Sequence, residues 1–372
     1  MKRIPEHDLR LLTSALTRLE HFVFLESSKF SDTDHRSILF TDPVDWLVCT
    51  AEDSASAFLK KCARWRAQGK YLAGWFAYEF GYLLEPAFSH FCAALLSSSQ
   101  ANKPLAVLGV FDHPVIFDHS TDIFLDNRPW PLSETEDIHK HEISNMQTNI
   151  GRDEYLSAIH RIKEYIAAGH TYQVNYTMKL KFDFSGHPAA LYRTLRRNPS
   201  VSYGAWIRQN GKDIMSFSPE LFSRINDEKI TVRPMKGTLA RGRTTDEDKA
   251  NRKWLQNDPK NCSENIMIVD LLRNDLGRVC DYGSVQVKEM RTIEEYEYVF
   301  QATSMIEGAL GGDKDAFDLR IEEVRIRQHP EQDSRPGHKQ GGDGGNTEAD
   351  EAADIRSGGN LVRHCLSLMQ VR

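Results

Sequence analysis

The chain has 372 residues, 40% of them hydrophobic, which is enough apolar material for a sizeable core and for two domains. Its formal net charge of −6 provides no positive field that would attract nucleic acid or an anionic membrane. No window approaches the roughly 18 apolar residues of a membrane span, and the charged N-terminal stretch is unlike a secretory signal, so neither is expected.

Six cysteines are scattered along the chain without a Cys-x-x-Cys pair. This spacing suits neither a structural zinc site nor a disulfide framework. Reduced thiols are typical of cytosolic proteins, so we expect a cytoplasmic location.

The first third of the chain mixes strand and helix patterns. Strands are expected at 21–26 and 105–111, and a helix at 54–67, where apolar residues recur at helical spacing. The apolar and aromatic segment 72–79 is expected to be a buried strand, with a bulge or a close backbone approach at Gly74.

The middle of the chain begins with a polar stretch, 120–150, that contains two prolines and lacks periodicity, so we expect a connecting segment. A helix from about Arg152 to Ala168 should follow and stop at Gly169. Further strands are expected at 172–184, 203–208, 214–217, 221–225 and 229–233, and further helices at 244–258 and 263–274.

The composition changes near Arg320. From there to Arg372 the chain has a glycine-rich run, interspersed charges and few large apolar residues before Leu361. Such a segment buries too little apolar surface to offset the entropy lost on ordering, so we expect a disordered tail. The expected regions are therefore 1–119, 120–150, 151–319 and 320–372.

Three blocks carry most of the residues suited to chemistry: 169–177 (GHTYQVNYT), 218–238 (from SPELF to RPMKGT) and 263–279 (SENIMIVDLLRNDLGRV). In this order and at these separations they resemble the chorismate-utilising enzymes, a family that includes anthranilate, aminodeoxychorismate, isochorismate and salicylate synthases. The segments 24–28 (FLESS) and 78–79 (YE) also resemble the family. Segment 24–28 resembles an amino-acid-binding element of some members, but here we expect it to be mainly core.

The resemblance implies an α+β fold. Two similar subdomains each place a β-sheet against helices, and the two sheets face each other across a central cleft. Region 1–119 would be the N-terminal α+β part, and 151–319 an incomplete chorismate-binding region.

Lys236 distinguishes the members of the family. Taken alone, a lysine between Pro-Met and Gly-Thr is usually an exposed residue near a turn, whereas a buried lysine can act as a nucleophile. Aminodeoxychorismate synthases typically have lysine at this position, and anthranilate synthases have alanine. The resemblance implies that Lys236 attacks C2 of chorismate and displaces the C4 hydroxyl, after which ammonia adds at C4 and expels the lysine.

Two glutamates have roles that the resemblance implies. Glu220, sixteen positions before Lys236, would protonate the departing hydroxyl, a role that requires a raised carboxyl pKa; otherwise it is a surface carboxylate. Glu264 would help hold Mg²⁺ against the ring carboxylate of the substrate. Its alternative role is to interact favourably with the dipole at a helix N-terminus.

The remaining expected substrate-binding residues are polar but not ionisable. Gln173 favours amination, because isochorismate and salicylate synthases resemble each other in using a lysine there to activate water, and an amide is not a base. Thr303 and Ser304 would donate hydroxyls to the substrate, or else belong to a half-buried strand. Thr238 completes the set.

The resemblance ends near Leu319. The family continues with a Gly-Ser-Ile-Thr-Gly-Ala-Pro-Lys segment, an arginine-bearing strand, a glycine-rich strand and an acidic cluster, and none of these follows here. A frameshift would give this pattern, and resequencing codons 315–325 tests that hypothesis. Because sheets without these strands expose edges and apolar faces, we expect a chain with poor stability and little or no activity.

The expected function is that of aminodeoxychorismate synthase component I. Chorismate and ammonia from a glutamine amidotransferase partner would give 4-amino-4-deoxychorismate for folate biosynthesis. The enzymatic alternative is anthranilate synthase component I. The non-enzymatic alternative is an inactive remnant that at most binds the amidotransferase subunit.

Overall fold

The computed structural model describes residues 3–98, 101–133, 140–171, 174–197, 202–312 and 367–371. The expectation for Gln173 and nearly all of the expected tail lie outside these ranges. No helix within the described ranges is long and apolar enough to cross a membrane.

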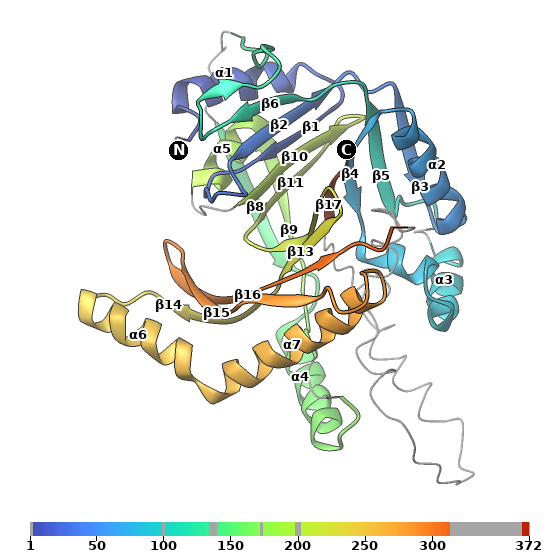
Figure 1. Ribbon diagram of the computed structural model, residues 1–372. Helices are drawn as coiled ribbons and strands as arrows, with labels where there is room; N and C mark the ends of the chain where they lie inside the picture. The colour runs from blue at the N-terminus through green and yellow to red at the C-terminus, as the bar shows by residue number, and fades with distance from the viewer. Residues whose placement is uncertain are drawn as a thin grey trace.

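The first sheet contains six antiparallel strands in the order β11-β10-β1-β2-β6-β7 (Figure 1). They are β1 (Phe22–Glu26), β2 (Arg36–Thr41), β6 (Val115–Asp118), β7 (Ile123–Phe124), β10 (Tyr203–Gln209) and β11 (Lys212–Ser218). In the pairing of β1 with β10, Phe24 lies opposite Trp206. Residues 203–218 therefore complete a sheet that begins near the N-terminus.

Two helices, α1 (Glu6–Thr17) and α5 (Pro188–Arg197), pack against this sheet. The apolar stripe of α1, formed by Leu9, Leu12 and Leu16, is fully buried with Tyr192 and Trp206. Burial of each leucine contributes roughly 2 kcal/mol to folding.

The second sheet has the order β17-β4-β5-β3. Its strands are β3 (Asp45–Cys49), β4 (Tyr71–Phe76), β5 (Ala106–Phe111) and β17 (Ser367–Val371). Helix α2 (Ala55–Ala67) packs against it, and the 3-10 helices η1 (Tyr78–Leu83) and η2 (Pro86–Phe88) lead to α3 (Ser89–Leu96). Residues from both sheets, including Phe40 and Phe111, share one core between them.

The close approach expected at Gly74 is confirmed. A Cβ atom there would overlap the carbonyl oxygen of Val107, so only glycine allows β4 to lie this close to β5. The register continues without interruption through the Gly74–Leu108 pair, so the alternative of a bulge does not apply.

The third sheet has the order β12-β13-β16-β14, with β15 also paired to β16. Its strands are β12 (Leu221–Asn226), β13 (Lys229–Arg233), β14 (Met235–Ala240), β15 (Gln286–Glu295) and β16 (Val299–Ala309). Helices α6 (Thr245–Asn257) and α7 (Pro259–Gly277) lie along one side of it (Figure 1). Buried residues of α7, such as Val269 and Leu272, pack with Ile306 of β16.

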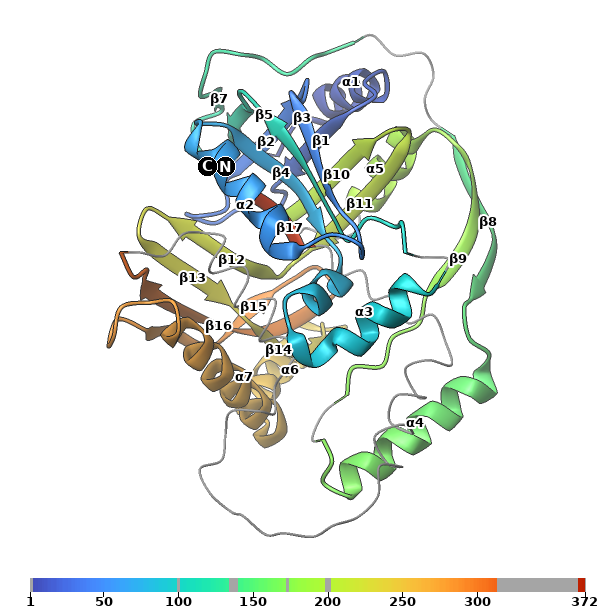
Figure 2. The same cartoon turned by 90° about the vertical axis from the view of Figure 1, so that its right-hand side faces the viewer.

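A two-stranded ribbon, β8 (His141–Thr148) with β9 (Leu180–Gly186), leads to helix α4 (Arg152–Ala167), which lies away from the first sheet (Figure 2). The expectation of a plain connection at 120–150 is corrected, because that segment contains β7 and β8. The strand expected at 172–184 begins only at Leu180. Both strands of the ribbon are exposed on both faces, and the sequence of β8 lacks the alternation of apolar and polar residues that predicts a strand.

The expected end of α4 at Gly169 is confirmed. Gly169 has a φ of +77°, its N–H donates to Ile166 at 3.1 Å, and the N–H of His170 donates to Tyr165 at 3.0 Å. These two bonds form a Schellman motif, whose left-handed residue is usually glycine.

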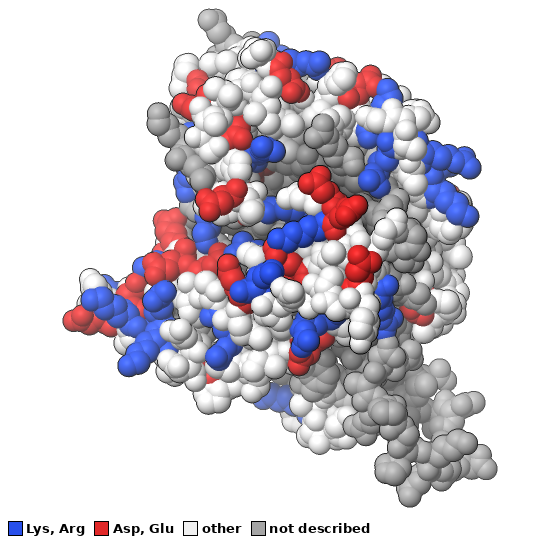
Figure 3. Space-filling model, viewed as in Figure 1, with Lys and Arg blue, Asp and Glu red and all other residues white. Residues whose placement is uncertain are grey.

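Charged side chains of both signs are interspersed over the face seen in Figure 3. This pattern agrees with the small net charge of the chain.

Candidate functional site

Lys236 lies in a bulge of strand β14. The register with β16 shifts between Met235 and Thr238, so Lys236 and Gly237 together oppose a single residue of β16. Gly237 has a φ of +99°, a conformation that favours glycine. Bulges re-aim side chains and are common beside active sites.

A second bulge lies on the other neighbour of β16. Strand β15 shifts register between Glu289 and Thr292, and Arg291 within the shift has a φ of +55°. Thr292 pairs with Thr303, which is also the partner of Met235 in β14. The two irregularities therefore meet at the same point of β16.

The Lys236 bulge packs against the junction of α6 and α7. A Cβ atom at Gly237 would lie 3.2 Å from Asn261 Oδ1 and 3.2 Å from Leu255 Cδ1. The side chain of Lys236 is half-buried and, within the described residues, its ammonium has no hydrogen-bond or ion-pair partner. An amine without a competing carboxylate is available to a substrate.

Helix α7 begins four residues before the expected 263–274, because Asp258 caps it by accepting from the N–H of Asn261 at 2.9 Å. Glu264 therefore lies in the second turn, away from the helix end where the dipole acts most strongly. Its carboxylate is about one-third exposed and lies 3.9 Å from the ammonium of Lys260.

Ser304 joins three elements around the bulge. Its hydroxyl donates to Asn265 Oδ1 on α7 at 2.7 Å and accepts from the N–H of Arg291 at 3.1 Å. Its N–H donates to the carbonyl of Pro234 at 3.1 Å. Ser304 is 1% exposed, so in this arrangement its hydroxyl is engaged within the protein.

Thr303 belongs to a second network, centred on the carboxylate of Glu294. Glu294 accepts hydrogen bonds from Thr303 (3.0 Å), Arg233 (2.6 Å), Lys29 (2.9 Å) and Tyr296 (3.0 Å). Burial alone would raise the pKa of Glu294, but the hydrogen bond from Lys29 and the charge of Arg233 hold it below its usual value. The network links the loop after β1 to the third sheet.

Glu220 follows β11 in the turn before β12. Its side chain is exposed, and its N–H donates to Ser218 Oγ at 3.1 Å. A general acid at this position would need a buried carboxyl group, and the described residues leave Glu220 exposed. Thr238 is also exposed on β14, next to the bulge.

The described residues do not form a ready-made metal centre. No group of three or more His, Cys, Asp or Glu side chains among them is arranged to hold a metal ion. Glu264 is the only expected Mg²⁺ ligand, and one carboxylate paired to Lys260 does not make a site.

The segment 24–28 is core, as expected. Glu26 is 3% exposed and accepts from Arg196 Nε at 2.6 Å and from the Tyr192 hydroxyl at 2.7 Å. Burial raises the pKa of Glu26 against the opposing charge of Arg196.

The end of the second sequence block (β14) and the start of the third (α7) thus meet beside Thr303 and Ser304 of β16. Comparison with known proteins identifies the family to which they belong, since the chorismate binding enzymes match residues 29–321. The chain belongs to this family.

Curated relatives of this chorismate-binding enzyme include two kinds of synthase. Anthranilate synthase component 1 of Acinetobacter calcoaceticus is 38% identical, over 48% of this chain and 37% of its own length. Aminodeoxychorismate synthase component 1 of Bacillus subtilis is 32% identical, over 60% of this chain and 53% of its own length. The chain thus spans about half or less of these relatives, and the two kinds of relative do not distinguish its reaction.

Solved structures show the same fold. Anthranilate synthase component I from Streptococcus pneumoniae matches with a TM-score of 0.63 at 19% identity, covering 89% of this chain and 85% of that chain. A 2,3-dihydroxybenzoate-specific isochorismate synthase from Bacillus anthracis matches with a TM-score of 0.58 at 16% identity, covering 82% and 72%. The expected α+β fold of chorismate-utilising enzymes is therefore confirmed.

Proposed function

We propose that this chorismate-binding enzyme aminates chorismate in the manner of aminodeoxychorismate synthase component I. The observation that carries the proposal is Lys236. Lysine at this position is typical of the aminodeoxychorismate synthases that the chain resembles, and alanine is typical of anthranilate synthases. Lys236 is half-buried in a bulge and lacks a counter-ion among the described residues.

The proposed reaction begins with attack by the amine of Lys236 on C2 of chorismate. A C2–N bond forms, the ring double bond shifts, and the C4 hydroxyl leaves as water after taking a proton from Glu220. Ammonia then adds at C4, the double bond shifts back, and the C2–N bond breaks to release the amine of Lys236. A proton from the added nitrogen returns to Glu220 and closes the cycle. The net change exchanges a hydroxyl for an amine, with chorismate and ammonia giving 4-amino-4-deoxychorismate and water.

Three further features belong to the same proposal. The curated relatives are named as component 1 of their enzymes, which supports a second component that supplies ammonia, here a glutamine amidotransferase subunit. The proposal also includes Mg²⁺, with Glu264 as one ligand. Because Glu264 alone does not make a site, the substrate carboxylate and water would have to complete the coordination. Folate biosynthesis in the cytoplasm is the proposed setting.

The test is turnover by the purified chain with chorismate, ammonium and Mg²⁺. The low turnover expected of the unmodified chain should fall at least about a hundredfold further in Lys236→Ala, because the nucleophile is lost. Lys249→Ala, at an exposed position of α6, is the matched control and should leave the rate unchanged. Equal turnover in Lys236→Ala and the unmodified chain would exclude the proposed nucleophile.

The product separates this reaction from that of anthranilate synthase. Anthranilate is fluorescent and appears without further enzymes, whereas 4-aminobenzoate should appear only after a lyase is added. Direct formation of anthranilate would therefore refute the proposed amination at C4.

A non-catalytic role is the second candidate. It is supported by the exposure of Glu220 and by the pairing of Glu264 with Lys260, which leave both carboxylates outside a preformed site. Capture of the amidotransferase subunit by the chain, without chorismate turnover in the complex, would favour this role.

A further inference from the structure

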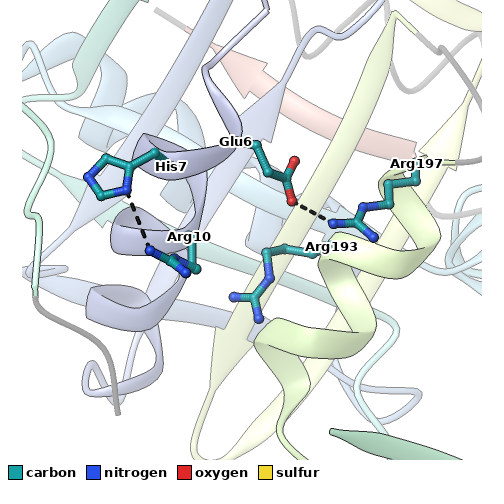
Figure 4. A pocket seen from close by; sticks show the side chains of 5 residues that line it. All are labelled: Glu6, His7, Arg10, Arg193 and Arg197. Atoms are coloured by element: carbon teal, nitrogen blue, oxygen red, sulfur yellow. Dashed lines mark hydrogen bonds and ion pairs between the residues drawn. The ribbon is translucent and has the colours of Figure 1, made fainter. Parts of the chain in front are cut away.

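A basic cavity of about 320 Å³ lies between α1 and α5, on the opposite side of the molecule from α6 and α7. Glu6, His7 and Arg10 reach it from α1, and Arg193 and Arg197 reach it from α5 (Figure 4). None of these residues belongs to the candidate site on β14 and β16. The cavity therefore needs an explanation of its own.

The lining of the cavity is strongly positive. Three guanidinium groups and the ring of His7 face one carboxylate, that of Glu6. Glu6 is paired with Arg197 at 2.9 Å, and both side chains are more than half exposed, which makes that pair weak. The lining therefore carries more positive charge than negative charge.

Arg193 lines the cavity and is itself largely buried. It is 6% exposed, and one of its N–H groups donates to Thr13 Oγ1 at 3.0 Å. Burial, and then the charges of Arg10 and Arg197, hold the pKa of Arg193 below its usual value against the opposing charge of Glu6. An anion in the cavity would reverse the electrostatic part of that effect.

Arg10 supplies a buried donor without an acceptor. Within the described residues its Nε–H has no hydrogen-bond partner, and its other contact, to His7 Nδ1, is long at 3.5 Å. A buried N–H of this kind is normally met by water or an ion. Because Arg10 lines the cavity, an anion bound there would lie next to this residue.

We propose that this cavity binds a phosphate-type oxyanion, either free phosphate or the phosphoryl group of a small metabolite. Guanidinium groups donate pairs of parallel hydrogen bonds that match the oxygen atoms of a phosphate. Arg10 and Arg193 come from neighbouring helices and so provide two such groups across one space. The inference is independent of the reaction proposed at Lys236.

The test measures anion binding to the purified full chain by titration calorimetry and by the midpoint of thermal unfolding. Inorganic phosphate should give saturable binding and raise the midpoint more than sodium chloride at equal ionic strength. Glycerol 3-phosphate is the second probe. Tighter binding of the ester identifies a phosphoryl metabolite as the ligand class, and tighter binding of inorganic phosphate identifies the free ion.

Two variants should move the affinity in opposite directions. Arg10→Gln removes a charged donor and should weaken phosphate binding about tenfold or more. Glu6→Gln removes the one carboxylate among the described lining residues and should strengthen binding several-fold. Arg152→Gln, an equal charge change on α4, should leave it unaltered.

Either of two results would overturn the proposal. The first is a phosphate effect no larger than that of chloride. The second is an affinity that neither Arg10→Gln nor Glu6→Gln changes. Because Glu6 is an exposed rim residue, its variant should fold normally even if Arg10→Gln does not.

Discussion

Replacing Gly237 by alanine should destabilise the bulge that presents Lys236. Two costs add at this position. A side chain at a φ of +99° costs about 1–2 kcal/mol, and the new Cβ would lie 3.2 Å from both Asn261 Oδ1 and Leu255 Cδ1, so these neighbours must move. Because alanine lowers the conformational entropy of the unfolded chain, about 0.4–1 kcal/mol of this loss is offset. We expect a net loss of about 2 kcal/mol.

Gly211 provides the matched control. It has a φ of +71° in the turn between β10 and β11, and a Cβ there would have no neighbour within 4 Å. Gly211→Ala therefore carries the backbone cost without the contact cost, and should lose about 1 kcal/mol or less.

Urea denaturation of both variants measures the difference in the free energy of unfolding. A turnover assay of the same samples reports whether Lys236 has moved. Equal destabilisation by Gly237→Ala and Gly211→Ala would refute the argument that the bulge is packed tightly against α6 and α7.

Two further predictions concern buried polar groups. Ser304→Ala removes the hydroxyl that joins Asn265 to Arg291, and urea denaturation should show a loss of about 1–3 kcal/mol in the free energy of unfolding. The control Ser263→Ala, at an exposed position of α7, should change that free energy by less than about 0.5 kcal/mol. Similar losses in the two variants would contradict the buried network. Asp118, buried at the end of β6, has a pKa of about 2, because hydrogen bonds from Ser120 and Arg36 and the charge of His35 outweigh the effect of burial. Ionised Asp118 contributes about 2 kcal/mol to the free energy of unfolding above pH about 4, and this contribution is lost as the pH falls through about 2. Between pH 5 and pH 2 the free energy of unfolding of Asp118→Asn should therefore fall less steeply than that of the unmodified chain. Equal pH dependence in the two proteins would contradict this assignment.

Regular elements with a buried face were predictable from the sequence. The periodic segment 54–67 and the apolar segment 105–111 agree with α2 and β5 to within a residue. Strand β8 was missed because neither of its faces is buried, so its residues carry no alternation. The early start of α7 depends on the cap at Asp258, which lies outside the apolar pattern.

The candidate site was predictable only in part. The resemblance implied that Lys236, Thr303 and Ser304 act on one substrate, and the pairing of β14 with β16 brings their segments together. The role of Glu294 had no local signal, because its partner Lys29 lies far away in sequence and meets it only after the sheets assemble. Exposure of Glu220 was likewise not visible in a motif that describes residue type alone.

The pairing of β1 with β10 has a consequence for synthesis of the protein. About 180 residues separate the two strands. At roughly 5–20 residues per second, a ribosome needs about 10–40 seconds to make the intervening chain. During that interval β1 can pair with β2, but the backbone edge of β1 that later pairs with β10 has no partner strand. Until the second half of its own sheet emerges, this edge is open to pairing with strands of other chains.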